Sequence, residues 1–191
     1  FQFISPAAQR KFKSRIIKEQ FARLAKMDID VEVQALTIDG VEDGLGYRTR
    51  ISMHVGKDGE VGFLGARSHE LYAIDDCLIA VEGSVQLAQD KVHLGQGDIS
   101  TAQSSTGQHV VVDQRGGPWL DETVGDRSWR IHAGSFWQVH KDAPKVFVDT
   151  VRRFANLKPG DKALDLYAGA GLFAASLDGD LSSKPSARRS R

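Results

Sequence analysis

With 191 residues, the chain is long enough for one large hydrophobic core or two small ones. It has no run of about 18 consecutive apolar residues, which excludes a membrane-spanning helix. Lys and Arg together number 25, as do Asp and Glu, so a polyanionic partner would have to bind a local basic patch. The single cysteine, Cys77, cannot form an internal disulfide, and we therefore expect a reducing, cytoplasmic setting.

The balanced net charge hides a gradient near the N-terminal end. Residues 1–26 carry seven basic side chains against one acid, Glu19, whereas residues 28–44 carry six acids and no base. Charge runs on helices are usually solvated faces. Charge alone therefore does not indicate a nucleic-acid-binding protein.

The first half of the chain predicts a helix followed by strands. Apolar residues recur at steps of three and four over residues 8–26, which is typical of a helix. Residues 31–35 and 47–55 alternate apolar and polar side chains, as half-buried strands do. A turn signal at residues 56–59 and a further apolar stretch at 61–64 predict a β-hairpin.

The second half predicts strands that alternate with helices. Short strands are expected at residues 109–113 and 129–132, with a Gly-Gly-Pro cluster at 116–118 as a plausible domain edge between them. A helix over 143–155 is followed by a buried apolar strand at 163–167, which leads into a glycine loop and another helix. This order is how a doubly wound α/β domain opens.

The strongest local motif is the glycine loop Asp165-Leu-Tyr-Ala-Gly-Ala-Gly171. Glycines at a strand-to-helix turn let the backbone approach a ligand, and the helix start presents free N–H groups. Gly169, Gly171 and Ala174 also satisfy the dinucleotide pattern G-x-G-x-x-[GA], which has many false positives. Asp165 favours an S-adenosylmethionine methyltransferase, because dinucleotide-binding folds keep this position apolar. An ordinary strand-to-helix turn stays open as the structural alternative.

Three sequence blocks follow one another along nearly the whole chain. The first is Gly46-Tyr-Arg-Thr-Arg50 together with residues 62–70, and the second is residues 74–79. The third runs from Gly134-Ser-Phe-Trp-Gln-Val-His140 to residues 165–173. In their order and spacing these blocks resemble the RNA 5-methyluridine (uracil-C5) methyltransferase family, and in particular its actinobacterial-type members.

The resemblance implies a site for S-adenosylmethionine. Gln138 matches the family glutamine that contacts the methionine part of the cofactor; without the resemblance it would be a polar residue near a helix N-terminus. Leu172 stands where many members have an asparagine that touches the cofactor, which puts one polar contact in doubt. The residues that match cofactor-binding positions are Gln138, Asp165, Tyr167, Gly169 and Gly171.

The resemblance also implies a reaction. In the family, a cysteine thiolate adds to C6 of uracil, C5 takes the methyl group, and a carboxylate base removes the C5 proton. A target base in a stem would first be flipped out. Both the nucleophile and the base follow the glycine loop in the family. We therefore expect this chain to be a truncated fragment that contains no catalytic residue and is inactive.

Cys77 precedes the glycine loop and is not that nucleophile. A lone cysteine among apolar residues is most often a small buried side chain. In some family members this position is the fourth ligand of an iron–sulfur cluster, and the other three cysteines lie before the point that matches Phe1. One thiolate cannot hold a cluster, so only a full-length parent would bind a 4Fe-4S cluster through Cys77.

A basic and aromatic hairpin is the candidate RNA contact. Unpaired RNA bases stack on aromatic rings while arginines bind phosphates. Composition alone favours a solvated face whose arginines pair with Glu60 or Glu70, whereas the resemblance favours RNA binding. The expected RNA-contact residues are Tyr47, Arg48, Arg50, Phe63 and Arg67.

The expected architecture begins with an α+β central domain, rich in antiparallel β-hairpins and facing RNA, over residues 1–125. The helix at 8–26 either belongs to this domain or packs on the methyltransferase domain. Residues 126–177 are expected to open a Rossmann-like α/β S-adenosylmethionine-binding domain that stays incomplete, and residues 178–191 to form a polar, aberrant tail.

The expected function is that of a fragment of an S-adenosylmethionine-dependent methyltransferase that forms 5-methyluridine in ribosomal or transfer RNA. We expect a monomer that has no membrane partner. Two alternatives stay open: an RNA-binding module without catalysis, and a fragment of a dinucleotide-binding oxidoreductase.

Overall fold

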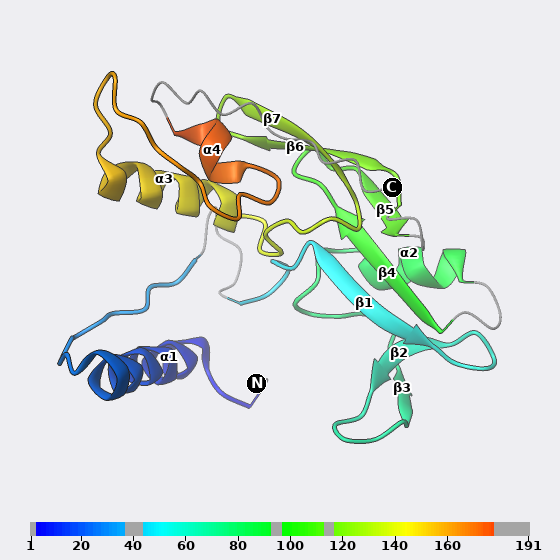
Figure 1. The fold of residues 1–191 in the computed structure, drawn as a ribbon. Coiled ribbons are helices and arrows are strands. Elements are labelled where there is room, and N and C mark those ends of the chain that lie inside the picture. The colour runs from blue at the N-terminus through cyan, green and yellow to red at the C-terminus, as the bar shows by residue number, and fades with distance from the viewer. Residues whose placement is uncertain (1–2, 37–43, 93–96, 113–116, 178–191) are drawn as a thin grey trace. The chain divides into compact units, whose positions relative to one another are not determined.

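The computed structural model describes residues 3–36, 44–92, 97–112 and 117–177 (Figure 1). The chain divides into two compact units, residues 1–45 and residues 46–191. No helix in the described ranges is long and apolar enough to cross a membrane. The predicted tail, residues 178–191, lies outside the described residues.

The first unit is a helix followed by irregular chain. α1 spans Pro6–Gln20 and continues into a π-helical turn, η1, over Phe21–Ala25, which confirms the helix predicted from apolar periodicity. The helix begins at Ser5, whose Oγ accepts a hydrogen bond from the Ala8 N–H at 3.3 Å. No residue of α1 or η1 is buried, so the described part of the first unit, taken by itself, has no core beneath the apolar stripe of this helix.

The strand predicted at residues 31–35 is wrong. This segment is irregular, and the Val33 N–H donates a hydrogen bond to Ser14 Oγ at 3.2 Å. Alternating side chains produce a strand only beside a partner edge, because an isolated strand leaves its backbone groups unpaired. No strand of the described first unit offers such an edge.

The second unit is built on a five-stranded antiparallel sheet with the order β3-β2-β1-β4-β5 (Figure 1). Its central strand β1 pairs with β2 and, on the other side, with β4. The structure confirms the hairpin predicted over residues 47–64. It also confirms the strand predicted at 109–113, of which residues 109–112 are described. Strands β3 and β4 were not predicted. The strands are β1 (Arg50–Val55), β2 (Val61–Leu64), β3 (Leu71–Ala73), β4 (Asp98–Gln103) and β5 (His109–Val112).

A first hydrophobic core lies between this sheet and α2 (Ser84–Lys91). Ile51 and Met53 of β1 are buried while Ser52 between them is exposed, as the pleat of a half-buried strand requires. The helix contributes Val85 and Ala88. The buried members of this core are Ile51, Met53, Val61, Ala80, Val85, Ala88 and Ile99.

A second core joins the sheet to the elements that follow it. β6 (Trp119–Val124) and β7 (Arg127–His132) form a separate hairpin, followed by α3 (Ala143–Ala155) and α4 (Leu172–Ser176). This confirms the predicted strand at 129–132, the helix at 143–155 and the helix after the glycine loop. The buried members are Ala102, Leu120, Val124, Ile131, Ala133, Trp137, Val148 and Leu172. The hairpin turns at Gly125, where a domain boundary was expected; the domain division of a full-length parent stays a prediction.

The strand predicted at residues 163–167 is wrong. This segment is irregular, and Leu164, Leu166 and Tyr167 are 81%, 69% and 103% exposed. A continuous apolar run forms a parallel strand only between neighbouring strands that bury both of its faces. No neighbour pairs with it in the described part of the chain. The described fold is therefore a mixed α+β structure with antiparallel sheets, and a Rossmann-like domain remains a proposal.

Candidate functional site

Residues 47–50 lie between two flanking segments of the second unit. Arg48 forms a parallel bridge with Ala80 and an antiparallel bridge with His140, so its backbone is held on both sides. The Tyr47 ring stacks on the imidazole of His140, with ring centroids 4.9 Å apart and planes 19° apart. The predicted RNA-contact residues at the start of β1 are thus fixed in position by their neighbours.

A cleft of about 540 Å³ opens beside this segment. Three of the predicted site residues on the hairpin, Arg48, Arg50 and Phe63, line the cleft together with Cys77. Hydroxyl groups add polar character, and apolar side chains line the rest. Other lining residues include Ser52, Ile79, Ser100, Gly134, Ser135 and Val139. The cleft therefore combines cationic, hydroxyl and aromatic groups, which is a composition suited to a nucleotide.

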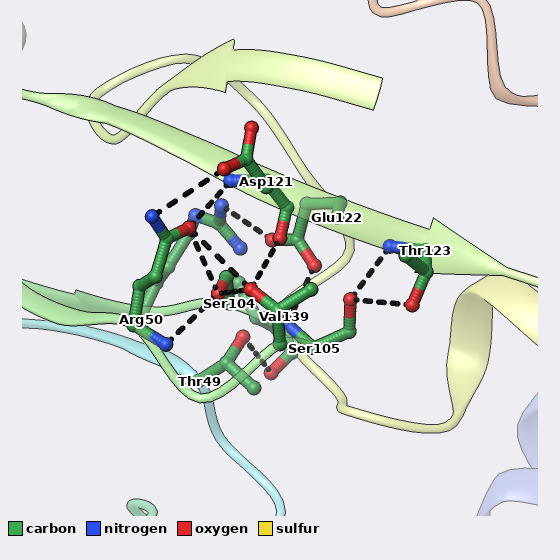
Figure 2. A network of polar contacts seen from close by, with 10 residues as sticks. Thr49, Arg50, Ser104, Ser105, Asp121, Glu122, Thr123 and Val139 are labelled. Carbon is green, nitrogen blue, oxygen red and sulfur yellow. Dashed lines mark hydrogen bonds and ion pairs between the residues drawn. The ribbon is translucent and has the colours of Figure 1, made fainter. Parts of the chain in front are cut away.

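Arg50, one of the predicted RNA contacts, is engaged inside the protein. Its Nη2 lies 3.2 Å from Oε1 of Glu122 on β6, and the two side chains are only 12% and 3% exposed (Figure 2). The other oxygen of Glu122 accepts a hydrogen bond from the Ser105 N–H at 2.9 Å. Nε and Nη1 of Arg50 are buried without a hydrogen-bond partner within the described residues. The Arg50 side chain is therefore engaged in linking β1 to β6 and not primarily in binding a ligand.

The turn between β4 and β5 holds the edge of β6 through side chains (Figure 2). The Thr123 N–H donates to Ser105 Oγ at 2.7 Å, and the Asp121 N–H donates to Gln108 Oε1 at 2.6 Å. Thr106 Oγ1 donates to the Asp121 carbonyl at 2.9 Å. These bonds satisfy backbone groups that an edge strand would otherwise expose, and they tie the β6–β7 hairpin to the five-stranded sheet.

The remaining hairpin residues lie at the surface. Phe63 is 37% exposed at the cleft, and Arg67, with φ +59°, lies in the β2–β3 turn and does not line the cleft. The acids that could have paired with these arginines are engaged elsewhere. Glu70 accepts from the Tyr72 hydroxyl at 2.9 Å, and Glu60 accepts from the Asp58 N–H at 3.1 Å.

The glycine loop is a tight turn in front of α4. Gly169 and Gly171 have φ values of +57° and +78°, and a Cβ added to either would meet nothing within 4 Å, so there is room for a ligand beside the loop. Asp165 Oδ2 accepts from the Ala174 N–H at 3.2 Å, so this carboxylate already bonds to α4. Tyr167 is fully exposed with φ +62°. These predicted cofactor-binding residues would form only part of such a site.

Gln138 and the glycine loop are each next in sequence to a residue of the second core. Gln138, which is half-buried, follows Trp137, and Gly171 precedes Leu172. Trp137 and Leu172 are both buried in the second core. Both predicted cofactor-binding segments are therefore anchored to one hydrophobic cluster, although they lie about 30 residues apart in the chain.

Cys77 is half-buried and lines the cleft. No group of three or more His, Cys, Asp or Glu side chains among residues 3–36, 44–92, 97–112 and 117–177 could hold a metal ion. Since the sequence has one cysteine, the residues present do not fit an iron–sulfur cluster.

The sequence reasoning missed Glu122. The alternation of β6 buries Leu120, Glu122 and Val124, so an acid occupies an inward position between two apolar residues. An acid in the apolar phase of a strand indicates a buried partner of opposite charge. That signal could have identified Glu122, although it could not have identified Arg50 as its partner.

No family model matches the chain. An uncharacterized RNA methyltransferase of Streptomyces coelicolor is 31% identical over 93% of this chain and 47% of its own length. Similar proteins named in the same way from Streptomyces avermitilis and Corynebacterium glutamicum are 30% and 29% identical, over 52% and 47% of their lengths. The chain thus spans about half the length of the relatives it matches.

A solved structure has a similar fold. The tRNA (uracil-54, C5)-methyltransferase of Pyrococcus abyssi, crystallised with S-adenosyl-L-homocysteine, superposes with a TM-score of 0.63 at 15% identity. The match covers 86% of this chain and 53% of that one.

Proposed function

We propose that this chain, a homologue of actinobacterial RNA methyltransferases over about half of their length, is part of an enzyme that methylates C5 of uracil in ribosomal or transfer RNA with S-adenosylmethionine. The observation that carries the proposal is the alignment of 93% of the chain with a protein named as an RNA methyltransferase. The fold of the uracil-C5 methyltransferase from Pyrococcus abyssi supports the choice of base and position. Neither comparison favours the dinucleotide-binding alternative.

The cleft beside β1 is the proposed RNA-facing site. Arg48 offers a cation and Phe63 an aromatic face in one hollow, a combination that suits a phosphate next to an unpaired base. Arg67 on the β2–β3 turn adds a second exposed cation outside the cleft. Arg50 contributes mainly by holding the wall of the cleft through Glu122.

The segments around Gln138 and the glycine loop are proposed to form one side of the cofactor site. S-adenosylmethionine, when bound, supplies an electrophilic methyl group on a sulfonium. Gly169 and Gly171 leave room for a ligand, while Asp165 shapes the loop by accepting from the Ala174 N–H. Tyr167, which is fully exposed, is available to pack on a ligand.

We also propose that these 191 residues do not transfer a methyl group by themselves. The proposed reaction needs a thiolate beside the methyl donor, and Cys77 lines the cleft between β1 and Gly134, not the glycine loop. Tritiated S-adenosylmethionine and RNA should therefore give no labelled RNA above background. Labelling that Cys77→Ala abolishes would make Cys77 the nucleophile and contradict this part of the proposal.

RNA binding by the purified chain tests the site. In fluorescence anisotropy with labelled transfer RNA and a ribosomal RNA fragment, Arg48→Ala should weaken binding on the order of ten-fold, the typical loss for one charge-assisted hydrogen bond. The control is Arg153→Ala on α3, which removes an equal charge from an exposed position outside the cleft. Equal losses of affinity in the two variants would mean that RNA binding depends only on net charge. That result would refute the cleft as the RNA-binding site.

A further inference from the structure

The outer face of the β6–β7 hairpin carries a half-exposed tryptophan. Along β6, the side chains of Leu120, Glu122 and Val124 are buried. Trp119 and Asp121 occupy the alternating positions, so their side chains point outward. Trp119 lies directly opposite His132 of β7 in the strand register and is 48% exposed. None of the predicted site residues lies on this face.

Three side chains form an aromatic and cationic group on this face. The rings of Trp119 and His132 have centroids 3.8 Å apart and planes tilted by 31°. The guanidinium carbon of Arg130 lies 5.7 Å from the Trp119 ring centroid, within the range of a cation–π contact. His132 is itself fixed, because its Nδ1 lies 3.2 Å from the Gly117 carbonyl, which can only accept.

The chemistry of this group favours nucleic acid over an apolar partner. Trp119 is not a member of the second core, so its large ring is not needed to fill that core. A tryptophan that stays half-exposed beside a guanidinium offers a stacking surface for an unpaired base and a cation for the adjoining phosphate. One acid shares this face: Asp121 lies opposite Arg130 in the strand register, and its Oδ2 accepts from Gln108 Nε2 at 3.5 Å, while Asp126 interacts with Arg127 at 3.7 Å. The stacking surface of Trp119 is therefore the main contact that this face offers.

We propose that Trp119, Arg130 and His132 form a second RNA-contact surface, separate from the cleft, which binds an unpaired nucleotide of the substrate RNA. A base stacks on Trp119 and its phosphate contacts Arg130, while His132 holds the tryptophan ring. This inference rests on the proposed function, because RNA is the partner there. It extends that proposal from one contact surface to two.

The test measures binding of a single-stranded oligouridine about ten nucleotides long to the full chain, by anisotropy and by quenching of tryptophan fluorescence. Trp119→Leu keeps an apolar side chain but removes the ring and should weaken binding about five-fold or more. Trp119→Phe keeps a ring and should restore most of the affinity. Arg130→Gln should weaken binding, whereas Arg127→Gln, on the same strand but ion-paired with Asp126, should not.

The outcomes separate the two proposals. If Trp119→Leu binds oligouridine like the wild type while Arg48→Ala binds it weakly, this surface is refuted and the proposed function stands. If the wild-type chain binds neither oligouridine nor folded RNA, both fail. Urea denaturation of each variant identifies unfolding, and Trp119→Phe, which preserves the packing on His132, separates loss of the ring from loss of the fold.

Discussion

The sequence pattern predicts that Arg50 is exposed, but the fold buries most of its side chain. It lies on the polar side of β1, but β6 brings Glu122 to it, and both side chains are almost covered. Removing one partner of such a pair leaves a buried charge without compensation, which costs far more than the net value of the pair.

We therefore predict that Arg50→Ala lowers the free energy of unfolding by about 3–5 kcal/mol. Adding Glu122→Gln should recover part of that loss, because glutamine removes the unpaired charge and can still accept from the Ser105 N–H. Urea denaturation of the single and double variants measures both effects. Arg153→Ala is the exposed control and should change stability by less than about 0.5 kcal/mol. Simple additivity of Arg50→Ala and Glu122→Gln would contradict the pairing.

The burial of His109 predicts that the stability of the fold depends on pH. Its Nε2 lies 3.3 Å from Ser84 Oγ, and burial lowers the pKa of His109 below its ordinary value of 6.5. The unfolded chain then binds a proton more readily than the folded chain does. The stability contributed by neutral His109 is present above about pH 6.5 and is lost as the pH falls through the folded pKa.

We predict that His109→Gln flattens the loss of stability between about pH 7.5 and pH 5.5. The urea midpoint at each pH is the measurement. His69→Gln, an exposed histidine in the β2–β3 turn, is the control and should retain the wild-type slope. Equal slopes for wild type and His109→Gln would show that other groups cause the dependence.

At the scale of the elements, the β2–β3 pair depends on a glycine. Gly62 pairs with Ala73, and a Cβ on Gly62 would lie 2.0 Å from the Tyr72 carbonyl oxygen and 2.9 Å from the Ala73 Cα. Both obstacles are backbone atoms, so the clash can be relieved only by moving a strand.

Gly62→Ala should therefore lower stability by about 1–3 kcal/mol. Gly97→Ala is the matched control, because its Cβ would meet nothing within 4 Å. Thermal denaturation compares the two variants. At an unhindered site, Gly→Ala restricts the unfolded chain and should not lower stability. A loss in Gly97→Ala as large as in Gly62→Ala would therefore contradict the clash with β3 as the cause.

The sequence predicted the elements whose stabilising contacts are close in the chain. The hairpin over 47–64 and the amphipathic helix over 143–155 carry their periodicity and turns within a few residues, and both form as expected. The strands expected at 31–35 and 163–167 do not form, because their patterns describe burial against partners that the described chain does not provide. β4 was missed because its buried face includes Thr101, a residue that breaks the apolar pattern.

Part of the candidate site could also be predicted from the sequence, and part could not. The cleft unites Arg48, Arg50 and Phe63, which the sequence had placed on one hairpin surface. Glu122 and Trp119 come from a strand more than 50 residues later, and only the tertiary fold brings Glu122 to Arg50. RNA and cofactor roles of the predicted residues stay predictions.

At the scale of the whole molecule, one core joins the two candidate surfaces. Ala102 of β4, Trp137 before Gln138, and Leu172 after the glycine loop belong to the same buried cluster. The proposed RNA-facing sheet and the proposed cofactor-facing segments are thus connected through packed side chains, and a change in this core should affect both.

The central claim is that the second unit binds RNA through the cleft beside β1. Ultraviolet cross-linking of the chain to transfer and ribosomal RNA containing 4-thiouridine, followed by mass spectrometry of the peptides, tests this claim most directly. We predict adducts on Phe63 and on other residues of 46–73, reduced in Arg48→Ala and unchanged in Arg153→Ala. Adducts confined to the basic helix α1, or spread equally over all exposed aromatic residues, would contradict it.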